Sequence, residues 1–152
     1  MHKILLAALF TLATSACLFS EGAKEEWTTN FEAAKKTAAE KKAPILVDFS
    51  GSDWCGWCIK LDKEVFSQKE FKDFAKDNLV LFLADFPRRS SQDEKIKKQN
   101  EELMKKYGAR GFPTVLLMDA EGLVFARTGY KAGGAASYVK HLKKLIEGWQ
   151  KK

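Results

Sequence analysis

The strongest constraint on the fold is an apolar strand that leads directly into a pair of cysteines. Residues 43–51 read APILVDFSG, a short run of branched and aromatic residues that stops at a glycine, which is the pattern of a buried β-strand. Cys55 and Cys58 follow at once, and residues 55–66, CGWCIKLDKEVF, have the pattern of a helix. The cysteine pair is therefore predicted to lie at a strand-to-helix turn.

The rest of the chain alternates between helical and strand-like segments. Ser67 and Glu70 form a capping-box pattern that predicts the start of a short helix, and the sequence AEG at 120–122 predicts a hairpin turn. The further predicted segments are helices at 30–42, 67–74, about 92–107 and 137–152, and strands at 79–86, 113–119 and 123–130.

This order predicts a single α/β domain. Strands that alternate with helices pair in parallel, and the later hairpin adds antiparallel strands, so we expect a central mixed β-sheet with helices on both faces. Of the 152 residues 45% are hydrophobic, which is enough for one core. Open sheets of this kind place their chemistry at the carboxyl ends of the strands, where this order puts the cysteines.

The first residues have the layout of a secretory signal. A basic start, an apolar run and small residues precede the expected cleavage point, and the apolar run is too short to span a bilayer. We expect a signal peptide at 1–16, with cleavage near Ala16 or as late as Gly22, a polar linker at 17–27 and the folded domain at 28–152. Cys17 follows the small residues as an acylated cysteine does in bacterial lipoproteins. The sequence thus predicts a periplasmic protein, either soluble or lipid-anchored through Cys17.

The formal net charge of +6 does not predict nucleic-acid binding. Lysines alternate with acidic residues in segments such as 24–42 and 90–106, which is typical of solvated helix faces. A surface for a polyanion would also need a basic face with stacking aromatic residues, and no spacing in the sequence marks one. Nucleic acid is therefore not the expected partner.

Cys55 and Cys58 have the spacing of a redox couple. Unpaired backbone N–H groups at the start of a helix favour an anion, so Cys55 is the predicted thiolate nucleophile. Cys58 lies on the same helical face and can resolve the mixed disulfide that Cys55 forms with a substrate. A structural zinc site is less favoured because it wants four ligands, and His141 lies far along in the last helix. A purely structural disulfide is also less favoured, because so short a loop removes little unfolded-state entropy.

The motifs around the cysteines resemble those of the thioredoxin family. The resemblance runs from about Ala43 to the C-terminus, and it is carried by SGSDWCGWCIK at 50–60 and GFPT at 111–114. A lone C-x-x-C is a weak signal, whereas these two motifs in this order are specific. The resemblance implies a thioredoxin-like fold and thiol–disulfide exchange at a Cys55–Cys58 disulfide, with no metal or organic cofactor.

The resemblance also implies roles for residues near the cysteines. Pro113 would follow a cis peptide bond and lie beside the cysteines, with the backbone of Phe112 pairing with a substrate strand. Trp54 and Trp57 would offer apolar surface to an extended substrate, with packing alone as the alternative role. Gly56 and Trp57, the residues between the cysteines, would contact substrate and help to set the reduction potential.

Asp48 is a carboxylate in an otherwise apolar strand. Burying a carboxylate is unfavourable unless it is paired or has a function. Asp48 resembles the family's buried acid, which assists proton transfer to the resolving cysteine, here Cys58. Two features depart from the family pattern: one additional residue lies between Asp48 and Cys55, and the strand at 79–86 lacks the lysine that commonly partners this acid. The catalytic role of Asp48 is therefore a hypothesis.

A narrower resemblance is to periplasmic disulfide reductases. It is carried by segments 51–60, 85–92, 98–103, 119–122 and 133–139. It implies the reduction of disulfides in envelope proteins, with electrons supplied by a membrane thiol transporter, and we expect the protein to be a monomer. The alternatives are an oxidase that donates its disulfide to folding proteins, and a thioredoxin-like adaptor or copper carrier that holds a soft metal between the two cysteines.

Overall fold

The computed structural model describes residues 27–151. The expected signal peptide, Cys17 and the expected linker up to residue 26 lie outside the described residues. The elements are α1 (Phe31–Lys41), β1 (Ile45–Ser50), α2 (Gly56–Leu61), the π-helix η1 (Asp62–Phe66), α3 (Lys69–Asn78), β2 (Val80–Asp85), α4 (Glu94–Tyr107), β3 (Thr114–Met118), β4 (Val124–Thr128) and α5 (Gly134–Gln150). Within residues 27–151, no helix has both the length and the apolar character needed to cross a membrane.

The strand that precedes the cysteines lies at the centre of a mixed sheet with the order β2-β1-β3-β4. β1 pairs in parallel with β2 and antiparallel with β3, and β3 and β4 form an antiparallel hairpin. Thr28 adds an isolated parallel bridge to Phe82 of β2. The predicted mixture of parallel and antiparallel strands is confirmed.

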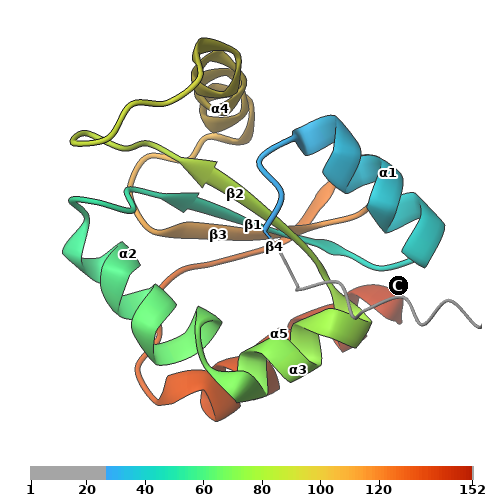
Figure 1. Ribbon diagram of the computed structural model, residues 1–152. Coiled ribbons are helices and arrows are strands. Elements are labelled where there is room, and N and C mark those ends of the chain that lie inside the picture. The colour runs from blue at the N-terminus through green and yellow to red at the C-terminus, as the bar shows by residue number, and fades with distance from the viewer. Residues whose placement is uncertain (1–26, 152) are drawn as a thin grey trace, which may run out of the picture.

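Helices cover both faces of the sheet (Figure 1). Successive side chains of a strand point to opposite faces, and in β1 Leu46 belongs to one apolar cluster, whereas Ile45, Val47 and Phe49 belong to another. The first cluster packs against α2, η1, α3 and α5, and the second against α1 and α4. The predicted α/β class, a central mixed sheet with helices on both faces, is therefore confirmed.

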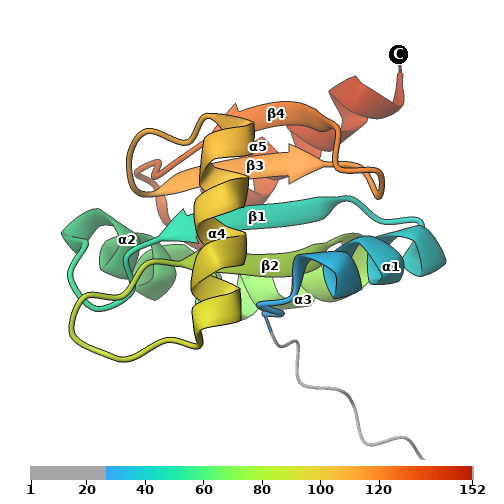
Figure 2. The ribbon, with the colours of Figure 1, turned by 90° about the horizontal axis from the view of Figure 1, so that it is seen from above.

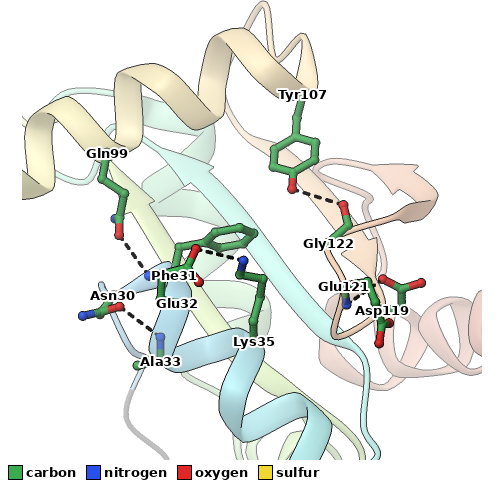
Figure 3. Close-up of polar contacts among 10 residues, drawn as sticks. All are labelled: Asn30, Phe31, Glu32, Ala33, Lys35, Gln99, Tyr107, Asp119, Glu121 and Gly122. Carbon is green, nitrogen blue, oxygen red and sulfur yellow. Dashed lines mark hydrogen bonds and ion pairs between the residues drawn. The ribbon is translucent and has the colours of Figure 1, made fainter.

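Side-chain hydrogen bonds tie α4 to α1 and to the turn between β3 and β4 (Figure 3). The Gln99 side chain accepts the backbone N–H of Phe31 (3.0 Å) and donates to the carbonyl of Thr29 (2.9 Å). The Tyr107 hydroxyl donates to the carbonyl of Gly122 (3.1 Å). Gly122 has a φ of 86°, a left-handed conformation that glycine adopts without strain, so the predicted hairpin turn is also confirmed.

The capping box predicted at Ser67 is wrong. Helix α2 continues through the π-helix η1, and Ser67 is the residue at which η1 ends. The Ser67 hydroxyl donates to Asp62 Oδ2 (3.0 Å) instead of capping the next helix. α3 still forms, with the rings of Phe71 and Phe74 buried in the core. The apolar periodicity of this segment was therefore a sufficient signal without the cap.

Candidate active site

Cys55 and Cys58 form a disulfide at the first turn of α2, close to the carboxyl end of β1. Cys55 is the N-cap residue of α2, and its sulfur accepts the backbone N–H of Cys58 (3.3 Å). This N–H group and the helix dipole would stabilise negative charge on Cys55 Sγ when the pair is reduced. The exposed fraction is 7% for Cys55 and 3% for Cys58, so Cys55 is the more accessible of the two.

Asp48 and Cys58 line the same cavity, whose volume is about 230 Å³. Trp27, the last residue of the expected linker, also lines it, and its ring packs on Phe66 with 5.0 Å between the ring centroids. Asp48 is buried, and its Oδ1 atom has no hydrogen-bond partner among residues 27–151. The fold thus brings the predicted buried acid and the predicted resolving cysteine to the lining of one cavity.

The surroundings of Asp48 favour its protonated form. Burial, and then the carboxylates of Asp62 and Asp85, raise the pKa of Asp48 from 3.8 to about 8. Leu83 lies opposite Asp48 in the register of β1 and β2, and Asp62 lines the same cavity. The acid therefore has carboxylates as its charged neighbours instead of the lysine common in the family. A group with a pKa near 8 can take up and release a proton close to neutral pH, as acid–base catalysis requires.

The loop before β3 lies at the same edge of the sheet as the disulfide. The Phe112–Pro113 peptide bond is cis, as the resemblance implied, and β3 begins at the next residue. Thr114 of β3 lies opposite Phe49, near the end of β1, which places Pro113 at the carboxyl end of the central strand. Phe112 is half-buried and its backbone is part of the loop that faces this edge.

Trp54 is held on several sides. Its Nε1 donates to the carbonyl of Phe86 (2.7 Å), and its ring lies edge-on to Phe112 with 5.7 Å between the centroids. The guanidinium carbon of Arg88 lies 3.5 Å from the centroid of the indole ring. A side chain at Gly51 would collide with that ring, because a Cβ atom there would lie 2.5 Å from Cε2 of Trp54. Glycine at position 51 therefore lets the indole fold back over the turn.

Trp57 differs from Trp54 in being largely open to solvent, with an exposed fraction of 58%. Its ring centroid is 5.1 Å from that of Tyr130, and Lys60 Nζ lies 5.2 Å from the Trp57 centroid. The Tyr130 hydroxyl donates to Glu64 Oε2 (2.7 Å). Gly56, beside Trp57, is exposed as well. The residues between the cysteines thus form an accessible apolar surface next to the disulfide.

Asp53 joins the active-site turn to the loop after β2, a contact that the sequence analysis missed. Its carboxylate accepts the backbone N–H groups of Arg88 (2.9 Å), Arg89 (2.7 Å) and Ser90 (3.0 Å). These hydrogen bonds, that from Arg88 most of all, lower the pKa of Asp53 to about 2. The partners lie 35 to 37 residues further along the chain, so no local pattern connects them with Asp53.

A metal site requires several ligand side chains that lie close together. Among residues 27–151, no three His, Cys, Asp or Glu side chains are grouped as a metal site would require. His141 lies on α5, where its Nε2 atom is 3.0 Å from the Thr128 hydroxyl. Both sulfurs of the C-x-x-C pair are engaged in the disulfide.

Comparison with known proteins identifies the family. A family model described as a thioredoxin-like domain matches residues 31–146. The chain belongs to the thioredoxin-like family. Within this family it is 38% identical over 122 residues to the disulfide bond reductase DsbH of Chlamydia pneumoniae, a match that covers 80% of this chain and 73% of DsbH.

Two further relatives of this thioredoxin-like protein are informative. A solved structure named DsbH oxidoreductase superposes with a TM-score of 0.77 at 37% identity, covering 80% of this chain and 84% of that one. The thiol:disulfide interchange protein DsbD of Cronobacter sakazakii is 33% identical over 85 residues, which cover 56% of this chain and 13% of DsbD. The narrower resemblance is therefore confirmed. Family membership and the C-x-x-C disulfide together make the chain a thiol–disulfide oxidoreductase.

Proposed function

We propose that this thioredoxin-like protein reduces disulfides in proteins of the bacterial envelope. The observation that carries the proposal is the site itself: Cys55, the more exposed of the two cysteines, lies at a helix start, and Cys58 lines one cavity with a buried acid. The direction of electron flow is supported by the 38% identity to a protein named as a disulfide bond reductase. The reaction uses only the two cysteines as its redox centre and needs no metal or organic cofactor.

The reaction proceeds by two thiol–disulfide exchanges. The Cys55 thiolate attacks one sulfur of the substrate disulfide, the substrate S–S bond breaks, and one substrate sulfur leaves as a thiolate. Cys58 then loses its proton and attacks Cys55 Sγ, which forms the Cys55–Cys58 disulfide and releases the second substrate thiolate. The substrate thus gains two electrons and the enzyme loses two, and each substrate thiolate takes up one proton, one released by Cys58 and the other from solvent.

Asp48 is the group that takes the proton from Cys58. It lines the same cavity, and its Oδ1 atom is free of hydrogen-bond partners within the described part of the chain. With a pKa of about 8, a fraction of Asp48 is ionised near neutral pH, and this carboxylate is a strong enough base to accept a thiol proton. Desolvation of both groups in the cavity favours transfer over separate ionisation.

The substrate occupies the surface around Cys55. The backbone at Phe112, before Pro113, pairs with an extended substrate segment, while Trp54, Gly56 and Trp57 contact its side chains. This role fits the position of the cis-proline loop at the carboxyl end of β1 and the large exposed fraction of Trp57. A backbone-paired substrate with apolar side-chain contacts suits an enzyme that acts on many proteins.

We propose a periplasmic location for the protein and a membrane protein as its electron donor. The protein is exported by its signal peptide, acts as a monomer in the periplasm either free or anchored through Cys17, and is reduced again by a membrane thiol transporter. The similarity to DsbD, a thiol:disulfide interchange protein, supports such a donor. The intact mass of the protein purified from its own cell envelope distinguishes the free from the acylated form, because acyl chains add a large mass.

The test of direction is the equilibrium reduction potential of the Cys55–Cys58 couple against glutathione. Tryptophan fluorescence is the readout, because Trp54 precedes Cys55 and Trp57 lies between the two cysteines. A potential near that of thioredoxin, about −270 mV, agrees with a reductase, and one near that of DsbA, about −120 mV, assigns the protein as an oxidase instead. Retention of a soft metal through purification, together with failure to reduce insulin, would identify an adaptor or metal carrier.

A further inference from the structure

The loop after β2 is built into the active site although it is distant in the sequence. We call residues 86–91 the arginine loop. Its backbone is held by Asp53, which accepts three of its N–H groups, and by Trp54, which donates to the carbonyl of Phe86. Ser52 adds hydrogen bonds from its N–H and its hydroxyl to the Asp85 carboxylate, just before the loop. Figures 1 and 2 both place this loop beside the turn that leads into α2.

Arg88 is the side chain of this loop that lies on Trp54, the residue before Cys55. Its guanidinium stacks on the indole of Trp54 at 3.5 Å from the centroid, and Trp54 directly precedes Cys55. Stacking on an aromatic face leaves the N–H groups at the rim of a guanidinium available for a planar anion. Within residues 27–151 the Arg88 side chain takes part in no ion pair and donates none of the hydrogen bonds between side chains.

Lys60, two residues after Cys58, is a second cation that lies over aromatic rings, but its environment is different. The rings are those of Trp57 and Tyr130, and Lys60 Nζ is 3.8 Å from Glu64 Oε1. Its charge is thus offset within the protein. The Asp53 carboxylate beneath the arginine loop is offset by the N–H groups that it accepts. Arg88 is therefore a charge on the ring of Trp54 that the described residues leave without a counter-ion.

We infer that Arg88 binds a carboxylate of the protein substrate, an aspartate or glutamate close to the attacked cysteine, and so selects disulfides with acidic neighbours. The inference rests on the proposed function, because the substrate must lie across Trp54 and Phe112. Because Arg88 lies on the ring of the residue that precedes Cys55, we expect the acidic residue to stand only a few positions from the attacked cysteine on an extended substrate chain. The rigid hold on the arginine loop lowers the entropy lost when the ion pair forms.

The test uses three synthetic peptides that each contain one intramolecular disulfide. They differ at one position, two residues from the attacked cysteine, which is Asp, Asn or Lys. The second-order rate constant for their reduction by the reduced protein is measured for the wild type, Arg88→Gln, Arg88→Glu and the neighbouring control Arg89→Gln. We expect the wild type and the control to reduce the Asp peptide about tenfold faster than the Asn peptide at low salt.

Substitution at Arg88 is expected to change the order of the peptides. The Arg88→Gln variant should reduce the Asp and Asn peptides with equal rate constants, and Arg88→Glu should reduce the Lys peptide fastest. A purely structural role for Arg88 would not produce this reversal. The wild-type preference weakens as salt is raised from about 0.02 M to about 0.5 M, because an exposed ion pair is screened. Equal rates for the Asp and Asn peptides with the wild type, or an unchanged preference in Arg88→Gln, would overturn the inference. If the reduced protein reduces none of the peptides, it is the proposed function that fails.

Discussion

Asp48 is the residue whose protonation links the stability of this thioredoxin-like protein to its chemistry. Its pKa is about 8 in the folded state and 3.8 as the reference value for an exposed aspartate. As pH rises through this window, the unfolded chain releases the proton while the folded protein keeps it, so unfolding becomes more favourable. The stability that neutral Asp48 contributes is fully present below about pH 4 and is lost as pH rises to about 8.

The substitution Asp48→Asn is expected to raise the free energy of unfolding near neutral pH and to slow turnover. Across the window, the difference between variant and wild type should grow by at most about 1.4 kcal/mol per pH unit, and then level off. Urea unfolding of both proteins over a pH series measures the first effect, and peptide reduction measures the second. A variant that is more stable but turns over at wild-type rates at every pH would remove Asp48 from the mechanism.

Asp62 is expected to tune Asp48 through charge. It lines the cavity and its carboxylate raises the pKa of Asp48, so Asp62→Asn should lower that pKa. The pH at which the turnover rate changes with Asp48 ionisation should move to lower pH. The midpoint of the Asp48 carboxyl titration, measured by NMR, should move in the same direction. Asp73→Asn is the matched control, because Asp73 is an exposed acid on α3 paired with Lys69. Equal profiles for the Asp62 and Asp73 variants would contradict the assignment.

At the scale of elements, the turn between β3 and β4 depends on a close fit to α4. Gly122 has a φ of 86°, and a Cβ atom there would lie 2.9 Å from the Tyr107 hydroxyl oxygen, which bonds to the Gly122 carbonyl. Gly122→Ala therefore introduces both backbone strain and a collision. We expect it to lower the free energy of unfolding by about 1–3 kcal/mol.

A glycine without these constraints is the control for that experiment. Gly148 lies in α5, and a Cβ atom there would meet nothing within 4 Å. Gly148→Ala should leave stability unchanged or raise it by at most about 1 kcal/mol, because alanine is the better helix former. Denaturant unfolding curves measure the free energy of unfolding of both variants. Equal values for the two would show that the turn tolerates a side chain at position 122.

At the scale of the whole molecule, the redox state and the stability of the fold are coupled. If the couple is a strong reductant, the folded protein must favour its disulfide form more than the unfolded chain does, so the oxidised protein should be the more stable. Each 30 mV of difference in potential between the folded and unfolded couples corresponds to about 1.4 kcal/mol. Urea unfolding of oxidised and reduced protein measures this difference directly. A more stable reduced form would indicate an oxidase.

The sequence by itself determined the elements and the reactive pair. Apolar periodicity predicted the strands and helices around Asp48, Cys55 and Cys58. Gly122, in the predicted hairpin turn, has a left-handed φ. These features depend on interactions between near neighbours along the chain, which a local pattern encodes. The exception is Ser67, which does not cap a helix as its local pattern predicted, because the preceding helix continues into η1 and the Ser67 hydroxyl bonds to Asp62.

Only the tertiary structure decided the surroundings of the pair. The placement of Asp62 on the cavity of Asp48, the hold of Asp53 on the arginine loop and the stacking of Arg88 on Trp54 all join separate segments or helix faces. Such contacts follow from how α2 and the loop after β2 pack at the end of the sheet, and no spacing in the sequence specifies that packing. The reactive cysteines can therefore be identified from the sequence. The charged groups near them take up their positions only when the chain folds.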